Sequence, residues 1–124
     1  MKQYNNPLTR LIKGTRYSLE GIYYALKHEQ SFQYEAIIFV ALCIFLCLVE
    51  LNLEHKIFLV IMWLIVMAFE LMNSAVEEAF DLIDENFRPK IKAGKDMLSG
   101  AVFLMISVNV MLWLAEIINA LVLS

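Results

Sequence analysis

Three long apolar runs limit how this chain can fold. The first covers residues 36–53, the second starts at residue 57 and continues to about residue 76, and the third covers residues 97–123. A helix needs roughly 20 residues to cross the hydrocarbon core of a bilayer. Hydrophobic residues also make up 60% of the 124 positions, more than a soluble domain of this size carries. We therefore predict one all-α integral membrane domain with three transmembrane helices, at about residues 33–53, 57–83 and 96–122.

The segment before the first run has the pattern of an amphipathic helix, which we predict over about residues 7–30. Pro7 lies near its start, where a missing N–H group costs nothing. One helical face would carry Leu8, Leu11, Ile12, Leu19, Ile22, Tyr23 and Leu26, and the other would carry Arg10, Lys13, Tyr17, Glu20 and Tyr24. Such a helix is suited to lie on a membrane surface.

The basic residues predict the orientation in the membrane. Nine of the ten Lys and Arg residues lie before the first run or between the second and third, and only Lys56 lies in the short turn after the first run. Positive residues favour the cytoplasmic side, so the N-terminus and the loop over residues 80–96 should face the cytoplasm. Within that loop, Pro89 is expected to end the helix, because proline lacks a backbone donor.

A polar stripe interrupts the second apolar run at its inner end. Glu70, Asn73 and Glu77 are spaced by three and four residues and so share one helical face, together with Ser74 and Asp81. An ionisable side chain facing lipid costs about 2.5–3.5 kcal/mol, so the stripe should face the inside of the bundle. Such residues can simply join helices by hydrogen bonds, which is our interpretation of the isolated Asn109. For the stripe we predict a functional site.

Carboxylates with few histidines favour a hard cation such as Mg²⁺, which commonly bridges protein carboxylates and substrate phosphates. Lys95, Arg10 and Lys13 are predicted on the same side of the membrane and could balance phosphate charge. A carboxylate can also act as a general base. The pattern indicates phosphoryl transfer at the membrane, although the chain has no phosphate-binding glycine loop. A small channel or transporter subunit, with Glu70 as a proton relay, is the alternative from another class.

The segments "RLIKGTRYSLEGIYYALKHEQSFQYE", "ELMNSAVEEAFDLI" and "AGKDMLSGAV" resemble, in order and spacing, the small integral-membrane prokaryotic diacylglycerol kinases. The resemblance covers roughly residues 8–118. It implies a homotrimer in the bacterial inner membrane, with its N-terminus in the cytoplasm and its active sites shared between subunits. It also implies transfer of the γ-phosphoryl group of ATP to a lipid hydroxyl with Mg²⁺, and it implies no nucleic-acid partner.

The resemblance also implies roles for individual residues. Glu70 matches the general base of the family, Glu29 and Glu77 match its Mg²⁺ ligands, and Asn73 matches a polar partner near the transferred phosphate. The implied ATP-binding residues are Arg10, Tyr17, Glu29, Glu77, Asn86, Phe87, Arg88, Lys95 and Asp96. The implied lipid-binding residues are Gly14, Thr15, Arg16, Leu19, Ser31, Phe32, Gln33, Glu35, Glu70, Asn73 and Ser99.

Two lipid substrates stay open within this resemblance. Phe32, Glu35 and the segment "NSA" favour diacylglycerol, whereas Leu82 favours undecaprenol, the substrate of a related branch. Leu19 stands where the diacylglycerol branch usually has tryptophan. The segment 86–88 also departs from the usual acidic-Tyr-His pattern. We expect diacylglycerol as the substrate and keep undecaprenol as the alternative.

Overall fold

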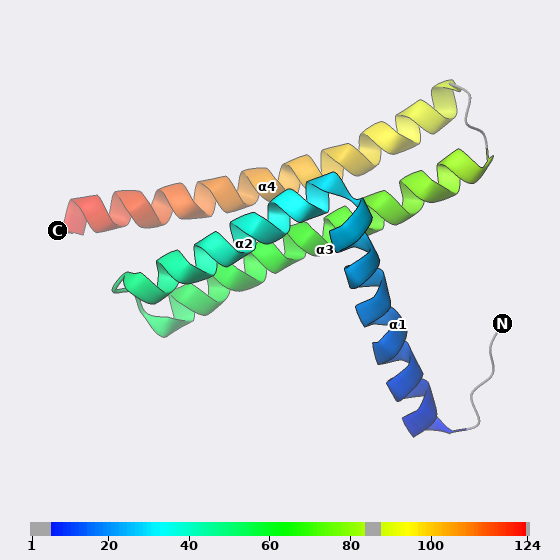
Figure 1. Cartoon of the computed structure of the whole chain (residues 1–124). Helices are drawn as coiled ribbons and strands as arrows, with labels where there is room; N and C mark the ends of the chain where they lie inside the picture. The colour runs from blue at the N-terminus through cyan, green and yellow to red at the C-terminus, as the bar shows by residue number, and fades with distance from the viewer. Residues whose placement is uncertain (1–5, 84–87, 124) are drawn as a thin grey trace.

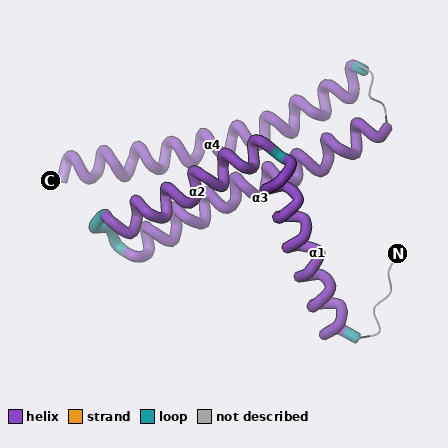
Figure 2. Tube along the Cα trace, in the orientation of Figure 1, coloured by secondary structure: helices purple, strands orange, loops and turns teal. Residues whose placement is uncertain are grey.

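The computed structural model describes residues 6–83 and 88–123, and the elements found in these ranges are four α-helices. Helices α2 (Gln30–Leu48), α3 (Leu53–Ile83) and α4 (Pro89–Leu123) lie side by side in an elongated bundle (Figures 1 and 2). Helix α1 (Pro7–His28) leaves the bundle at the start of α2 and points away from it (Figure 1). The predicted all-α fold with three apolar helices long enough to cross a membrane is confirmed, and a further helix precedes them.

Local signals explain the start and the end of α1. The side chain of Asn6 accepts a hydrogen bond from the backbone N–H of Thr9 at 2.7 Å, and Pro7 occupies the first helical position. Both residues are favoured there. At the other end Glu29 adopts an extended conformation that separates α1 from α2. The Gln33 amide donates to the carbonyl of Leu26 at 2.9 Å and joins the two helices across this corner.

Helices α2 and α3 form a tight hairpin, but the turn is not where the sequence predicted it. Helix α2 ends at Leu48 rather than near residue 53, and α3 begins at Leu53 rather than at residue 57. Val49 is extended, and the carbonyl of Asn52 accepts the N–H of Lys56 at 3.1 Å. Asparagine is favoured just before a helix, which explains the early start of α3.

The prediction that Pro89 ends a helix was wrong. Pro89 is the first residue of α4, a position where its missing N–H group leaves no helical hydrogen bond unmade. Helix α4 therefore starts seven residues before the predicted third span and carries Lys92, Lys95 and Asp96 in its first turns. These charged side chains are consequently held on a helix and not in a loop.

The core of the bundle follows one face of α3. Leu59, Trp63, Val66 and Glu70 are all buried, and their spacing of four, three and four residues places them on one side of the helix. Phe32 and Leu46 of α2 and Val102 and Asn109 of α4 are buried as well. The Asn109 amide donates to the carbonyl of Met62 at 3.1 Å, so our interpretation of this residue as a link between helices is confirmed.

Most of the large apolar side chains lie outside this narrow core. Each of α2, α3 and α4 is long and apolar enough to cross a membrane, and no more than 22% of the most apolar window of any of them is buried. Side chains that are apolar and exposed in this way are those that lipid or another apolar surface would cover. We conclude that the chain is a multi-pass membrane protein.

Candidate active site

Two carboxyl groups meet in the interior of the bundle. Glu70 of α3 is 5% exposed, and Glu35 of α2 is 6% exposed. Their carboxyl groups lie within electrostatic and hydrogen-bonding reach of each other. The Asn73 amide donates to Oε2 of Glu70 at 3.1 Å. Glu70 is therefore buried next to two polar neighbours, Asn73 and Glu35, as predicted for a residue that faces the bundle interior.

A second link at this point was not predicted from the sequence. The indole Nε1 of Trp63 donates to the backbone carbonyl of Glu35 at 2.9 Å. Trp63 lies seven residues before Glu70 and thus on the same face of α3. That spacing was the available signal, but a tryptophan inside an apolar run is ordinarily interpreted as core packing.

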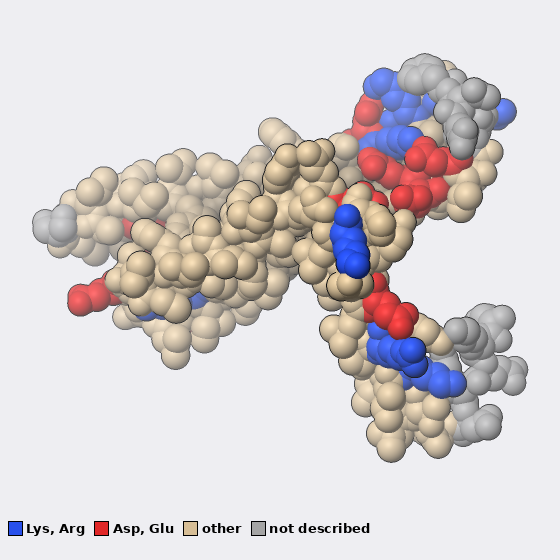
Figure 3. Space-filling view, viewed as in Figure 1, with Lys and Arg blue, Asp and Glu red and all other residues tan. Residues whose placement is uncertain are grey.

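Helix α3 continues beyond the start of α2 and carries a charged cluster at its end. Glu77 lies within electrostatic reach of Lys95, Glu70, Glu29 and Asp81. The ammonium group of Lys95 donates to Oδ1 of Asp81 at 2.7 Å and so joins α4 to α3. Figure 3 shows acidic and basic side chains gathered at the end of the bundle where α3 ends and α4 begins. This cluster brings together Glu29, Glu70, Glu77 and Lys95 from distant parts of the sequence.

A close approach of α3 and α4 supports the cluster. A Cβ atom on Gly94 would lie 2.7 Å from the ring of Phe80, closer than real contacts allow. Glycine at this position lets the first turns of α4 lie against the ring. The neighbouring Lys95 consequently reaches Asp81, while Asp96 pairs with Lys92 on its own helix. Lys95 thus faces the acidic cluster, and Asp96 is exposed.

A groove between α1 and α3 adjoins the cluster. Its lining includes Tyr17 and Glu29 from the first helix and its end, and Ser74 from α3. The groove has a volume of about 480 Å³. Two of the sequence-predicted nucleotide residues, Tyr17 and Glu29, therefore lie near the polar stripe within a single chain.

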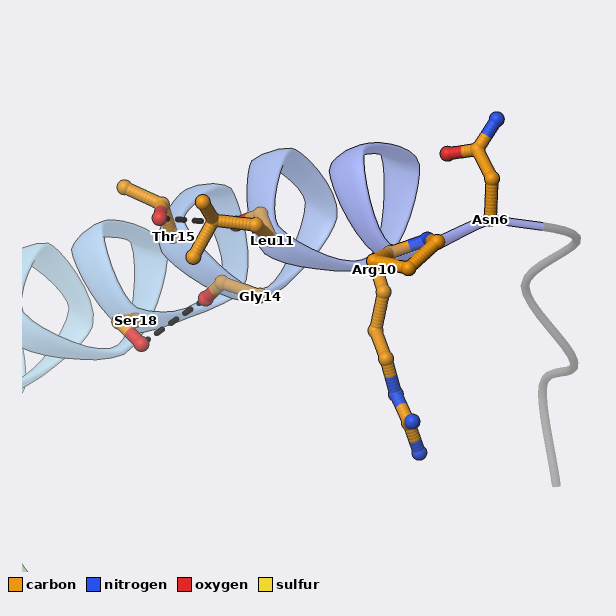
Figure 4. A pocket seen from close by; sticks show the side chains of 7 residues that line it. Asn6, Arg10, Leu11, Gly14, Thr15 and Ser18 are labelled. Atoms are coloured by element: carbon orange, nitrogen blue, oxygen red, sulfur yellow. Dashed lines mark hydrogen bonds between the residues drawn. The ribbon is translucent and has the colours of Figure 1, made fainter.

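The outer part of α1 is not joined to this cluster. Arg10, Gly14 and Thr15 line an open groove of about 700 Å³, all of whose lining residues belong to α1 or to its cap (Figure 4). Arg16 and Leu19 line another groove formed by α1 alone. Because α1 points away from the bundle, these five predicted site residues do not meet Glu70 in the same chain (Figure 1).

The other predicted site residues are more scattered. Ser31, Arg88 and Ser99 are exposed, and Gln33 is half-buried with its amide bonded to α1. Phe32 is only 2% exposed and therefore contributes to the core rather than to an open surface. The predicted nucleotide residues Asn86 and Phe87 lie outside the described residues.

The carboxylates suit a hard cation that also binds phosphate. In residues 6–83 and 88–123, no group of three or more His, Cys, Asp or Glu side chains is arranged to hold a metal ion. Mg²⁺, however, usually takes only one or two protein carboxylates, with water and substrate phosphates as its other ligands. Glu29 and Glu77 lie near each other and supply such a pair of oxygen donors. The residues present therefore fit Mg²⁺ carried by a nucleotide.

Comparison with known proteins identifies the family. The family model of the prokaryotic diacylglycerol kinases matches residues 16–117. The chain belongs to this family. It is 38% identical over 109 residues to the diacylglycerol kinase of Haemophilus influenzae, which covers 86% of this chain and 90% of the relative. It is 30% identical over 105 residues to the diacylglycerol kinase of Escherichia coli, covering 85% of this chain and 86% of the relative.

A relative named for a different substrate also matches. The undecaprenol kinase of Bacillus subtilis is 33% identical over 101 residues, covering 82% of each chain. The family is therefore one of lipid kinases, and the chain is an enzyme of this class that takes ATP as its co-substrate. This membership decides against the channel or transporter subunit. Membership of the family does not distinguish between the two lipids.

Proposed function

We propose that the protein transfers the γ-phosphoryl group of ATP to the hydroxyl group of diacylglycerol, yielding phosphatidic acid. The observation that carries the proposal is the position of Glu70, which is buried in the bundle and bonded to Asn73, two helical turns before Glu77 in the charged cluster. A lipid hydroxyl can approach such a site from the membrane, and a nucleotide can approach it from the water-facing end.

Glu70 is proposed as the general base. Phosphoryl transfer depends mainly on positioning and on neutralising charge, so the protein needs few reactive groups. The Asn73 bond fixes one oxygen of Glu70 and directs the carboxyl group, which would accept the lipid proton as the oxygen attacks phosphorus. The carboxyl group of Glu35 is a second neighbour of Glu70 in the bundle interior. We assign Glu35 to the lipid side of the site because it lies at the start of α2.

Glu29 and Glu77 are proposed to hold Mg²⁺ on the ATP phosphates. Bound Mg²⁺ would neutralise phosphate charge and orient the γ-phosphoryl group. Lys95 is placed to interact with a phosphate, because its ammonium group already lies against the acidic end of α3. Tyr17 and the groove beside it would take the nucleoside end of ATP.

The proposed enzyme is a homotrimer with sites shared between subunits. Support comes from α1, whose predicted nucleotide and lipid residues Arg10, Gly14 and Thr15 form a groove apart from Glu70 of the same chain (Figure 4). A cyclic trimer has head-to-tail interfaces, so one subunit can place a segment into the site of the next. We propose that α1 serves a neighbouring subunit in this way.

Mixing two inactive variants should restore activity if α1 acts across the interface. Arg10→Ala removes a proposed nucleotide contact on α1, and Glu70→Gln removes the base on α3. In randomly mixed trimers about a quarter of the sites would combine an intact Arg10 with an intact Glu70 from adjacent subunits. We therefore expect co-expression to give about a quarter of wild-type activity, measured as phosphatidic acid formed per trimer.

The control for this experiment is Glu70→Gln mixed with Glu77→Ala, because both residues lie on the same helix. This mixture tests whether two changes in one helix complement less well than changes in α1 and α3. Differently tagged chains purified in two steps establish that mixed trimers form. Mixed Arg10→Ala and Glu70→Gln trimers that are no more active than either parent would contradict a site shared through α1.

The protein is proposed to lie in the bacterial inner membrane with its N-terminus in the cytoplasm. The charged cluster at the α3–α4 end and the basic residues of α1 are on the side that the positive-inside rule assigns to the cytoplasm. ATP is available on that side. The exposed apolar residues of α1, such as Leu8, Leu11 and Ile12, would then lie in the inner membrane surface.

Diacylglycerol is expected to react about tenfold faster than undecaprenol at equal surface concentration. The exposed Ser31 lies one turn before Glu35 and can donate to an ester group next to the reactive hydroxyl. One such hydrogen bond is worth roughly fivefold to tenfold, and a polyprenol lacks the ester. Initial rates in mixed micelles with both lipids and saturating Mg²⁺ and ATP would measure this preference.

Ser31→Ala provides the matched variant for the lipid test. It should narrow the preference for diacylglycerol while leaving the undecaprenol rate unchanged. The alternative substrate is favoured by the exposed Leu19 and Leu82, both at positions that depart from the diacylglycerol branch. Undecaprenol reacting tenfold faster than diacylglycerol would assign the protein to the other branch and leave the kinase activity as it is.

A further inference from the structure

Helix α3 contacts Glu35 of α2 at two points. Its backbone carbonyl accepts the indole N–H of Trp63 at 2.9 Å, and its carboxyl group lies within hydrogen-bonding reach of Glu70. Trp63 and Glu70 lie two turns apart on the same face of α3, and both are buried. A single residue of α2 thus lies between two polar groups of its neighbouring helix.

Helix geometry explains how both contacts are made at once. Backbone carbonyls in α2 point toward its C-terminal end, whereas side chains lean toward its N-terminal end. Because α2 and α3 run antiparallel in a hairpin, the carbonyl of Glu35 points toward the earlier Trp63. The Glu35 side chain points toward the later Glu70. The indole bond therefore fixes the position of α2 along α3 at the residue that meets Glu70.

We propose that Trp63 is a positioning residue, whose indole N–H holds Glu35 against Glu70 and thereby sets the orientation of the general base. This inference rests on the proposed role of Glu70. The Asn73 amide donates to Oε2 of the Glu70 carboxyl group, and the Glu35 carboxyl group lies beside it. Without the indole bond, the first turns of α2 can shift along α3, and the Glu35 contact is weakened. Glu70 then spends less time in the orientation that accepts the lipid proton.

The second tryptophan of the chain offers a matched comparison. Trp113 on α4 packs against Phe45 of α2 with ring centroids 5.9 Å apart, so it also joins two helices. Its indole nitrogen, however, is buried without a hydrogen-bond partner among the described residues. Replacing either tryptophan by phenylalanine removes a similar volume. Only the change at Trp63 removes an interhelical hydrogen bond.

The test compares Trp63→Phe with Trp113→Phe in the purified enzyme. We expect Trp63→Phe to lower kcat about fivefold, the effect of one lost hydrogen bond, with the KM for ATP within about twofold of wild type. Trp113→Phe should leave kcat within about twofold. NMR of the indole N–H groups supplies a readout independent of activity. The Trp63 resonance should lie downfield and exchange slowly with solvent, whereas the Trp113 resonance should not show the hydrogen-bond shift.

A double-variant measurement separates positioning from general packing. In a Glu35→Ala background the carboxyl partner is gone, so adding Trp63→Phe should lower kcat less than twofold further. If Trp63→Phe fails to fold, 3-(3-benzothienyl)alanine incorporated at position 63 keeps the bicyclic shape and removes only the N–H group. It should reproduce the fivefold loss.

Three results would overturn the inference: equal kcat losses for the two tryptophan variants, an undiminished loss in the Glu35→Ala background, or wild-type kcat with the benzothienyl side chain. Glu70→Gln, measured in parallel, keeps the two proposals apart. If the Glu70→Gln enzyme is active, Glu70 is not the general base. If Glu70→Gln is inactive but Trp63→Phe is fully active, the proposed base stands and only the positioning role of Trp63 is excluded.

Discussion

Replacing Glu70 by glutamine is expected to lower kcat by about 10²- to 10⁴-fold, the usual contribution of a general base. The amide has nearly the same shape as the carboxyl group but cannot accept the lipid proton. Its oxygen can still take the hydrogen bond from Asn73, and its NH₂ group can donate to Glu35. The buried polar contacts therefore keep partners, and the fold should be retained. Phosphatidic acid formation from radiolabelled ATP provides the rate.

The control for this variant is Glu54→Gln, which removes one carboxylate from the first turn of the same helix, at the opposite end of α3 from the charged cluster. It should keep wild-type kcat. Thermal unfolding in detergent and nucleotide binding to Glu70→Gln should both resemble wild type. If the purified Glu70→Gln enzyme kept more than half of its activity, Glu70 could not be the base.

The sequence was sufficient to predict the helices and their order. Apolar runs longer than the bilayer requires have few alternatives to a spanning helix, since unpaired backbone groups are too costly in lipid. The inward position of Glu70 was predictable for a related reason, because a carboxyl group is unfavourable against lipid. The spacing of Glu70, Asn73 and Glu77 then placed the remaining polar groups on the same face.

Contacts between helices were much harder to predict. Pro89 can end one helix or begin the next, and the sequence rules permit both. The pairing of Glu35 with Glu70 depends on the relative position of α2 and α3, which the turn at residues 49–52 fixes. A one-residue error in that turn rotates the facing side chains by about 100°. For the contact from Trp63 to the backbone of Glu35, the only signal was the spacing of Trp63 and Glu70 on one face of α3, which is ordinarily interpreted as core packing.

The direction of α1 relative to the bundle could not be predicted from the sequence either. An amphipathic pattern shows that one face of a helix is apolar, but it does not show what covers that face. The extended conformation of Glu29 turns α1 away from the bundle, and its apolar side chains stay exposed. As a result the residues predicted for one site are divided, with Tyr17 near the cluster and Arg10 far along α1. If the predicted residues form one site, a second subunit or a movement of α1 would have to bring them together.

Replacing Glu77 by alanine is expected to raise the Mg²⁺ concentration needed for half-maximal activity by about 10- to 100-fold, a range seen even for residues that only support a metal ligand. Glu77 lies among Lys95, Glu70, Glu29 and Asp81, so its carboxylate is central to the cluster that would meet the phosphates. Removing it leaves Glu29 as the remaining proposed ligand. Mg²⁺ titrations at saturating ATP and lipid would measure the change.

Excess Mg²⁺ should rescue part of the Glu77→Ala activity, because Mg²⁺ can keep a water molecule where a carboxylate is missing. Glu29→Ala should shift the titration in the same direction. In the double variant, activity should stay low at every Mg²⁺ concentration, since no proposed protein ligand remains. Glu54→Ala, the control at the other end of α3, should titrate as wild type does. Wild-type Mg²⁺ dependence in both single variants would show that these carboxylates do not share a metal ion, and the acidic cluster would then act on the nucleotide only through its charge.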